Sequence, residues 1–340
     1  LARLFGLHVA DAVEKFEGSD YDVYTRAKIV KLLEADLTQE ANRAALEQAV
    51  DMDNYLFYMA LEVLFTNADW PFNNVTMWRY LGEEDPSNPY SDGRFRFIID
   101  DMDQILSNGL HGDPAQWSTE LIDYLMRDQG HTFHHVMACE KYRDTFLTYV
   151  DDLLKTAFAP GRACALLDEL YDAMKNEYIL DYGEEFWAEM EKTREVTKQN
   201  VREKEALYRE NIEKYMGLAD RVPVTIEAAE GVTVAWNNMT VSQGINEAGS
   251  AGAGGSADDA GNNSPAGSAA GASLGGTWVN AYYSGTSIPM TARTAEGYRL
   301  AGWEVNGELC SEEASFTLEI GEEAVTLRAV AVRSDDDAAR

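Results

Sequence analysis

Cysteine is scarce in this chain, which excludes folds that depend on many cysteines. The 340 residues include 3 cysteines, Cys139, Cys164 and Cys310. They are too few and too scattered for a disulfide framework or a thiolate zinc site. The cysteines therefore leave the redox compartment of the protein open.

Positive charge is also scarce. The chain has 28 Lys and Arg residues against 59 Asp and Glu residues, which gives a formal net charge of −31. Such a field repels nucleic-acid phosphates and anionic lipid headgroups, so we expect no nucleic-acid partner. The acidic surface serves solubility, and it could also suit cationic substrates or metal ions.

Long hydrophobic runs are absent as well. No apolar run approaches the roughly 20 residues of a membrane-spanning helix, so we expect no membrane-spanning segment. The sequence starts at Leu1, without a Met, a basic stretch or the apolar stretch of a signal peptide. We therefore expect that the native chain starts further upstream, and the missing signal peptide says nothing about secretion.

Aromatic and aliphatic residues are plentiful by contrast. Hydrophobic residues make up 45% of the chain and aromatic residues 11%, with 7 Trp and 17 Tyr, which is enough to build a core. The composition shifts near residue 220. We therefore predict an α+β protein with a mainly helical domain at 1–218, a separate small all-β, sandwich-like domain at 219–333 and a tail at 334–340.

The first domain opens with helical patterns. Two of them cover residues 24–49, and Thr38 is placed to cap the second helix. Asp51 or Asp53 is placed to cap a third, very apolar helix that runs into Asn67.

Two short strands and further helices follow. Segments 75–80 and 95–99 predict the strands of a hairpin, separated by a turn-rich stretch. Amphipathic helices then cover about 118–215, with breaks near Pro160 and Gly183.

The second domain alternates apolar and polar residues. We predict strands at 222–228, 232–236, 278–283, 298–305, 316–320 and 325–332. Residues 246–276 are nearly all small or polar and cannot bury apolar area, so we predict a disordered insertion there.

The most informative polar pattern lies around the two short strands of the first domain. Asn67, Asp69 and Asn74 follow the apolar helix, and Asp101 and Asp103 follow the second strand. Phosphoryl transfer needs a carboxylate to accept the substrate hydroxyl proton, and an Asn and an acidic group to hold Mg²⁺ against the nucleotide phosphates. Asp69 and Asn74 have the spacing of a protein-kinase catalytic loop. This spacing alone is also common in loops whose side chains cap turns.

The surrounding sequence resembles the CotH kinase family over roughly residues 20–218. The resemblance is carried by Asp51-Met52-Asp53-Asn54-Tyr55, by Asn67-x-Asp69-Trp70-x-x-Asn73-Asn74, by Trp78-Arg79 and by Gly93-x-Phe95-Arg96-Phe97-Ile98-Ile99-Asp100-Asp101-Met102-Asp103. Softer matches follow at Tyr142-Arg143, Pro160-Gly161, Trp187 and Arg202.

The resemblance implies a secreted or surface-associated bacterial protein kinase. Such a kinase has a kinase-like C-lobe with a small β-hairpin at the active site. It uses ATP and Mg²⁺ or Mn²⁺ to phosphorylate Ser or Thr hydroxyls of surface or coat proteins. Carried over, Asp69 would be the catalytic base. Asn74 and Asp101 would bind the cofactor and its metal, Asp103 would be a further candidate ligand, and Asn73 could merely cap the loop.

The sequence also departs from the family pattern. In the family a preceding lobe supplies the lysine that clamps the nucleotide, but only about 20 residues precede the recognisable region, and no Gly-rich phosphate loop is present. We therefore expect an N-terminally truncated kinase domain that could lack full nucleotide affinity.

Other candidate sites have simpler interpretations. His131 and His135 are spaced to share a helix face, with His134 between them, but no carboxylate completes a known metal pattern. The carboxylates around Trp187 fit a helix of mixed charge better than a hydrolase pair. Trp70 fits a packing anchor of the loop as well as a platform for adenine.

The second domain resembles repeat modules of bacterial cell-surface proteins. The resemblance rests on Gly285 to Ala292 and on Gly297-Tyr298-Arg299-Leu300-Ala301-Gly302-Trp303. Such modules are spacers or adhesive units, and Trp303 is expected to be a core residue. The alternative hypothesis for the whole chain is therefore a surface adhesion or spore-coat assembly protein with an inactive kinase-like lobe.

Overall fold

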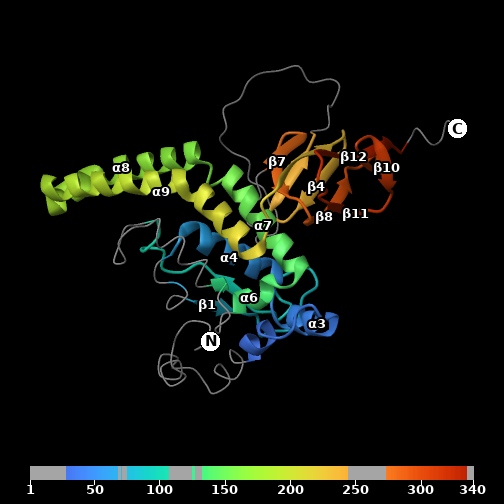
Figure 1. Cartoon of the computed structure of the whole chain (residues 1–340), viewed down its shortest axis with the longest axis horizontal. Helices are drawn as coiled ribbons and strands as arrows, with labels where there is room; N and C mark the ends of the chain where they lie inside the picture. Colours follow the sequence, from blue (N-terminus) through green and yellow to red (C-terminus); the bar gives the residue numbers. More distant parts are fainter. Residues whose placement is uncertain are drawn as a thin grey trace. The chain divides into compact units, whose positions relative to one another are not determined.

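A computed structural model describes residues 28–67, 70, 75–106, 125–126, 132–243 and 273–334. The chain divides into two compact units, Leu1–Ala219 and Asp220–Arg340 (Figure 1). The first unit combines helices with a two-stranded sheet, and the second is all β. This mixture agrees with the predicted α+β class.

The first unit is mainly helical. Its elements are α3 (Glu40–Ala49), α4 (Met52–Phe65), β1 (Thr76–Trp78), β2 (Arg96–Ile98), α6 (Thr132–Met137), α7 (Glu140–Lys155), α8 (Pro160–Tyr182) and α9 (Glu184–Met216). Residues 28–33 are also helical. Strands β1 and β2 pair antiparallel, with Thr76 opposite Ile98.

The predicted caps of two helices can be compared with the structure. Asp51 caps α4 by accepting a hydrogen bond from the Asn54 amide at 3.2 Å, which settles the choice between Asp51 and Asp53. Thr38 is not the cap of α3, contrary to the prediction, because Gln39 occupies that position. The Thr38 amide and hydroxyl instead donate to the Asp36 carboxylate, at 3.1 and 2.5 Å.

Helix α4 forms the centre of the first unit. It is buried on nearly all sides, as expected from its apolar composition. The Tyr149 hydroxyl on α7 donates to the Asp53 carboxylate at 2.6 Å, and the rings of Phe57 and Tyr149 lie 5.2 Å apart. The hydrogen bond and the ring contact join α4 to α7.

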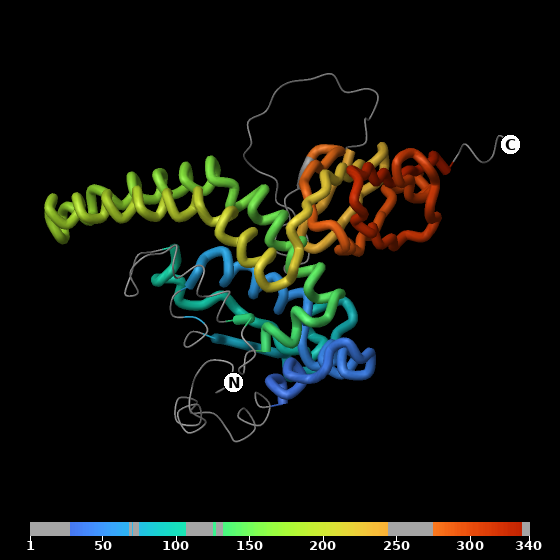
Figure 2. Tube along the Cα trace, viewed as in Figure 1, coloured from blue at the N-terminus to red at the C-terminus, as the bar shows by residue number. Residues whose placement is uncertain are grey.

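Helices α8 and α9 form a long hairpin (Figure 2). Gly183 is the only residue between them, and its φ of 87° lies in a region that side chains rarely tolerate. Trp187 is buried against α8, where its ring lies 6.1 Å from that of Tyr171 and 6.3 Å from that of Tyr178.

The second unit is a sandwich of two five-stranded sheets. Its strands are β3 (Arg221–Ala228), β4 (Val232–Trp236), β5 (Met239–Ser242), β6 (Ser273–Leu274), β7 (Thr277–Tyr283), β8 (Ser287–Thr294), β9 (Tyr298–Val305), β10 (Glu308–Ser311), β11 (Ser315–Glu319) and β12 (Val325–Arg333). One sheet has the order β10-β9-β12-β3-β7, and the other has the order β11-β8-β4-β5-β6.

Both sheets contribute to one apolar core. Val224 and Leu327 come from the first sheet, Val234 and Ile288 come from the second, and Trp303 on β9 is fully buried among them. The inner faces follow the alternation that the sequence showed, since side chains of a strand point to opposite faces in turn.

Parts of the predictions for this unit need correction or lie outside the described residues. Strands β5, β8 and β10 were not anticipated. Most of the predicted disordered insertion, residues 246–276, is not described, but at its end Ser273–Leu274 form β6 and pair with β5. Of the predicted tail, Ser334 is described and 335–340 are not.

Candidate functional site

The structure describes half of the predicted phosphotransfer residues. Asp101 and Asp103 are described and follow β2, and both are exposed. Asp69 and Asn74, like Asn73, lie outside the described residues. The geometry of the site therefore has to be built from the segments that flank the loop.

The first flank of the loop is held against the segment that carries Asp101 and Asp103. The Asn67 side chain is fully buried, and its amide nitrogen lies 3.5 Å from the Met102 sulfur. The backbone N–H of Leu106 donates to the carbonyl of Phe65 at 2.9 Å. The end of α4 is thereby fixed beside residues 101–106.

The second flank of the loop is held against the same segment. Thr76, at the start of β1, donates its hydroxyl to the Asp100 carboxylate at 2.8 Å. The pairing of Thr76 with Ile98 continues this contact along the sheet. The loop between Asn67 and Thr76 therefore begins and ends beside residues 100–103, which we call the acidic segment.

Two backbone turns at the site adopt an uncommon conformation. Thr66 at the end of α4 has a φ of 50°, and Asp101 has a φ of 49°. A left-handed conformation is unfavourable for a β-branched residue such as Thr and is better tolerated by Asp. Such strain is kept where the surroundings enforce it, often at functional sites.

Helix α4 also anchors strand β2, which leads into the acidic segment. The Asn54 side chain accepts a hydrogen bond from the Phe97 N–H at 2.7 Å and donates to the Phe97 carbonyl at 3.3 Å. Asp51, the cap of α4, forms an ion pair with Arg96 at 3.0 Å. The Asp-x-Asp helix start noted in the sequence is therefore structural: Asp51 bonds to β2, and Asp53 to α7.

Arg96 itself is enclosed by polar and aromatic partners. Its guanidinium forms two hydrogen bonds to Asp92, both at 2.9 Å, and lies 5.7 Å from the Trp78 ring and 5.1 Å from the Tyr90 ring. Burial alone would raise the pKa of Asp92, but hydrogen bonds from Arg96 and Arg94 hold it well below its usual range. This network fixes the turn before β2.

Two buried ionisable residues near the loop were missed from the sequence. Lys204 on α9 is 4% exposed, and its side-chain nitrogen donates to the Thr66 hydroxyl. Burial lowers the pKa of Lys204 to about 7. The lysine lies in a run of charged residues on a long helix, and nothing in that pattern distinguishes it from its solvated neighbours.

Glu62 on α4 is the second missed residue. It is fully buried, and burial raises the pKa of its carboxyl to about 7, although Asn67 and Tyr58 partly offset this by stabilising the charged form. Lys204 and Glu62 therefore approach consecutive residues, Thr66 and Asn67, where the chain enters the loop.

The donor chemistry of the acidic segment suits a divalent cation. Asp101 and Asp103 offer carboxylate oxygens, the ligands that Mg²⁺ prefers in proteins. Asp103 accepts a long hydrogen bond from Gln104, at 3.4 Å. Within the described ranges no three His, Cys, Asp or Glu residues gather closely enough to hold a metal. A metal site here would need a donor from the loop.

Two of the remaining sequence candidates, Trp70 and Trp187, are packing residues. Trp70 is 2% exposed and packs edge-on against Tyr58, so it is a packing anchor, and Trp187 is a packing residue of the α8–α9 hairpin. His134 and His135 lie on α6, outside any metal cluster of the described chain, and His131 is not described.

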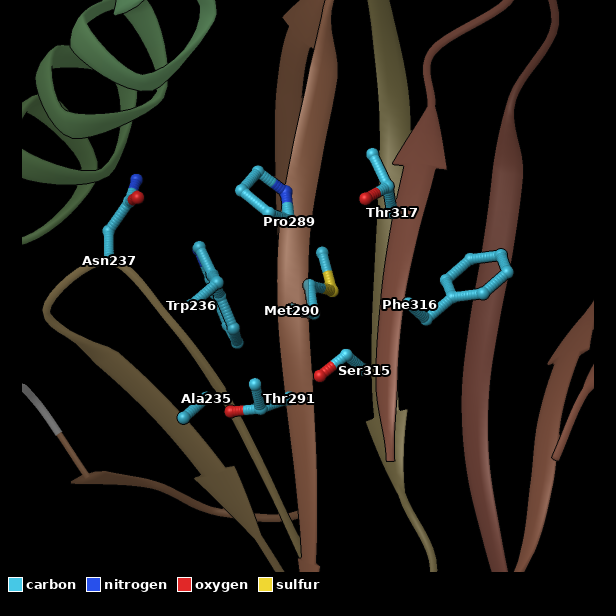
Figure 3. A pocket seen from close by; sticks show the side chains of 9 residues that line it. All are labelled: Ala235, Trp236, Asn237, Pro289, Met290, Thr291, Ser315, Phe316 and Thr317. Carbon is cyan, nitrogen blue, oxygen red and sulfur yellow. The ribbon is translucent and has the colours of Figure 1, made fainter. Parts of the chain in front are cut away.

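The second unit has a hollow of about 350 Å³ on one sheet (Figure 3). Strands β4, β8 and β11 line it with Ala235, Trp236, Pro289, Met290, Thr291, Ser315, Phe316 and Thr317, together with Asn237 in the turn after β4. None of these side chains is charged or titrates near neutral pH. The hollow therefore offers no carboxylate or imidazole that could act as acid or base in phosphoryl transfer.

Comparisons with known proteins found one family model matching in each unit. A family model described as CotH kinase protein matches residues 11–215, and a model described as a divergent InlB B-repeat domain matches residues 268–330. No curated protein and no solved structure matches the chain. In the part of the chain that the structure describes, no helix has the length and apolarity to cross a membrane. The CotH model covers more than half of the sequence, and the chain belongs to the CotH kinase protein family.

Proposed function

We propose that this protein is an atypical protein kinase that transfers the γ-phosphate of ATP to Ser or Thr hydroxyls of surface or coat proteins. The proposed site joins Asp69 and Asn74 of the loop to Asp101 and Asp103 of the acidic segment. Membership of the CotH kinase protein family supports this proposal. The protein is accordingly proposed to act at the surface or in the coat of a bacterium, or after secretion.

One observation carries the proposal. Both flanks of the loop are anchored to the acidic segment, through Asn67 and Met102 on one side and through Thr76 and Asp100 on the other. Asp69 is two residues from Asn67, and Asn74 is two residues from Thr76. The anchoring therefore favours a single site made of loop and segment together.

Each residue has a role that phosphoryl transfer requires. Asp69 would accept the proton of the attacking hydroxyl as general base. Asn74, Asp101 and Asp103 would supply oxygen ligands to Mg²⁺ or Mn²⁺. The bound metal would neutralise charge on the ATP phosphates. The residues of the chain would orient the hydroxyl and hold its proton.

The first test is phosphate transfer to Ser- and Thr-containing protein substrates. Asp69→Ala and Asp69→Asn are expected to abolish transfer while the circular dichroism spectrum stays that of the parent. Asp220→Asn, an exposed aspartate at the start of the second unit, is the matched control and should retain activity. Full activity of a correctly folded Asp69→Ala protein would rule out the assigned base.

The second test is metal-dependent ATP binding, measured by calorimetry. Binding should require Mg²⁺ or Mn²⁺ and should be lost in Asp101→Ala. The measurement is made on this chain and on a version extended at its N-terminus, because the family takes its nucleotide-clamping lysine from a preceding lobe. Absence of binding in both would argue against the kinase proposal.

A second candidate function is adhesion or coat assembly, with an inactive kinase-like lobe. The observation in its favour is the separate sandwich, which matches a divergent InlB B-repeat domain and offers no acid or base in its hollow. Binding to a surface or coat protein that is indifferent to ATP and to Asp101→Ala would favour this candidate.

A further inference from the structure

Helix α8 has one apolar seam that faces α9. The seam follows the alternating three-and-four spacing of a coiled coil and consists of Cys164, Leu167, Tyr171, Met174 and Tyr178. Cys164 and Leu167 pack in a cluster with Val201 of α9, and Tyr171 and Tyr178 contact Trp187. These contacts account for the packing of the hairpin.

The same helix has a second seam that none of the described residues of its own unit covers. This outer seam has the same alternating spacing and consists of Leu166, Leu170, Ala173, Glu177 and Leu180. Its three leucines are 53%, 50% and 84% exposed, and Ala173 and Glu177 are exposed as well. At 100° per residue the two seams lie about 120° apart around the helix.

Two seams at this separation are typical of a helix that packs between two others. A helix in contact with one neighbour needs a single apolar stripe, and its other faces are normally polar. The hairpin supplies one neighbour, α9. The spacing of the outer seam therefore fits a second helix better than an irregular segment.

The charged residues around the outer seam indicate which kind of helix would bind there. Glu169, Glu177 and Asp181 are exposed on or beside the seam, and among the described residues none of them takes part in an ion pair. Arg162 lies one turn before the seam. A helix with basic residues beside its apolar stripe would pair with these carboxylates.

A second copy of this chain is a poor occupant. Each copy has a formal net charge of −31, which opposes self-association. An antiparallel pair centred on Ala173 would also place Leu170 against Glu177 and desolvate the carboxylate without a partner. A different, basic protein avoids both costs.

We infer that the outer seam of α8 is a docking surface for a basic amphipathic helix of another protein. The apolar stripe of that helix packs on Leu166, Leu170 and Leu180, and a lysine or arginine within it faces Glu177. This inference does not depend on phosphate transfer, because it rests on the exposed seam and its charge alone.

The test uses the full chain and three synthetic peptides in fluorescence anisotropy. The first is a 21-residue amphipathic helix with leucines on one stripe and lysines beside it. The second has glutamates in place of the lysines, and the third keeps the lysines but has glutamines in place of the leucines. The first peptide should bind at least about tenfold more tightly than either of the others.

Variants locate the binding surface. Leu166→Gln/Leu170→Gln/Leu180→Gln should weaken binding of the first peptide at least about tenfold. The three leucines are exposed, so the fold should be retained. Ala188→Gln/Ala206→Gln changes exposed residues of α9, outside the seam of α8, and should bind like the parent. Equal binding of all three peptides, or unchanged binding by the leucine variant, overturns the inference. So does a dimer in sedimentation that the leucine variant abolishes, because the occupant would then be a second copy.

Discussion

The first unit packs carboxylates and a lysine between its helices, whereas the sandwich of the second unit encloses almost entirely hydrocarbon and aromatic rings. Glu62, Asp151, Asp152 and Lys204 are each no more than 4% exposed, while Thr286 is the polar side chain buried to that degree in the described part of the sandwich. Burying charge is unfavourable unless it is compensated. The comparison indicates that buried polar contacts help to join the elements of the first unit, such as Lys204 to Thr66 and Arg209 to Asp151, whereas the core of the sandwich is held by apolar packing.

Lys204→Met is expected to have the largest effect on stability, because it removes the buried lysine of the first unit. Lowering the lysine pKa from its ordinary 10.5 to about 7 means that the folded protein binds fewer protons than the unfolded chain between these values. The free energy of unfolding should therefore rise by roughly 5 kcal/mol as pH increases from 7 to 10.5, and this rise should be missing in the variant.

Chemical denaturation of both proteins across this pH range measures the difference. Lys192→Met, an exposed change on the same helix, is the control. If the free energies of unfolding of the parent and of Lys204→Met differ by the same amount at every pH, the lowered pKa of Lys204 is contradicted.

Trp303→Ala tests the apolar core of the sandwich in the second unit. The indole is fully buried, stacks on Phe316 at 5.5 Å and donates to the Glu313 carbonyl at 2.9 Å. Its removal should destabilise the sandwich by about 3–5 kcal/mol, independent of pH between 5 and 9. Denaturant unfolding followed by near-UV circular dichroism measures the loss, and a shift below about 1 kcal/mol would show that the core refills the cavity.

Glu62→Gln should reveal the opposite pH dependence to that of Lys204. The pKa of Glu62 is raised from 4.5 to about 7, so the folded protein binds more protons than the unfolded chain in this window. Stability of the parent should fall by roughly 3 kcal/mol as pH rises from 4.5 to 7, and the variant should not show this loss.

Thermal unfolding at closely spaced pH values between 4.5 and 7 follows the effect of Glu62. Glu140→Gln on α7 is the exposed control. If the parent and Glu62→Gln lose stability in parallel, the carboxyl is charged throughout the range.

Thr76→Val should have the smallest effect. It removes the hydroxyl that donates to Asp100 at a solvent-accessible position, which is worth about 0.5–1.5 kcal/mol. Hydrogen exchange at β1 and β2 should increase locally while the melting temperature changes little. If Thr76→Val lowered the free energy of unfolding as much as Trp303→Ala does, the contact would stabilise much more of the first unit than β1 and β2.

Much of this architecture could be predicted from periodicity. The apolar run of α4 and the alternating strands of the sandwich are local patterns, and burial in the structure follows the same period. For the cap of α4 the sequence left Asp51 and Asp53 open, and the structure decides for Asp51. The acidic segment after β2 was also identifiable, because consecutive carboxylates at the end of a strand are unusual.

Other elements depend on contacts that no local pattern specifies. Strand β8 was not anticipated because Pro289 lies within it, and proline is disfavoured inside sheets. The structure tolerates it because the pairing with β4 covers Thr291–Thr294 and ends before Pro289, so no ladder bond is lost on that side. Glu62 and Lys204 look like ordinary helix residues until α4 and α9 enclose them.

The two bonds from Asn54 to Phe97 have a consequence for the edge of the small sheet. The side-chain amide of Asn54 offers one acceptor and one donor, as a backbone peptide group of a neighbouring strand would. A helix residue thus completes the edge of β2 and blocks the addition of a foreign strand there. It also joins α4 to the strand from which the chain continues into Asp101 and Asp103.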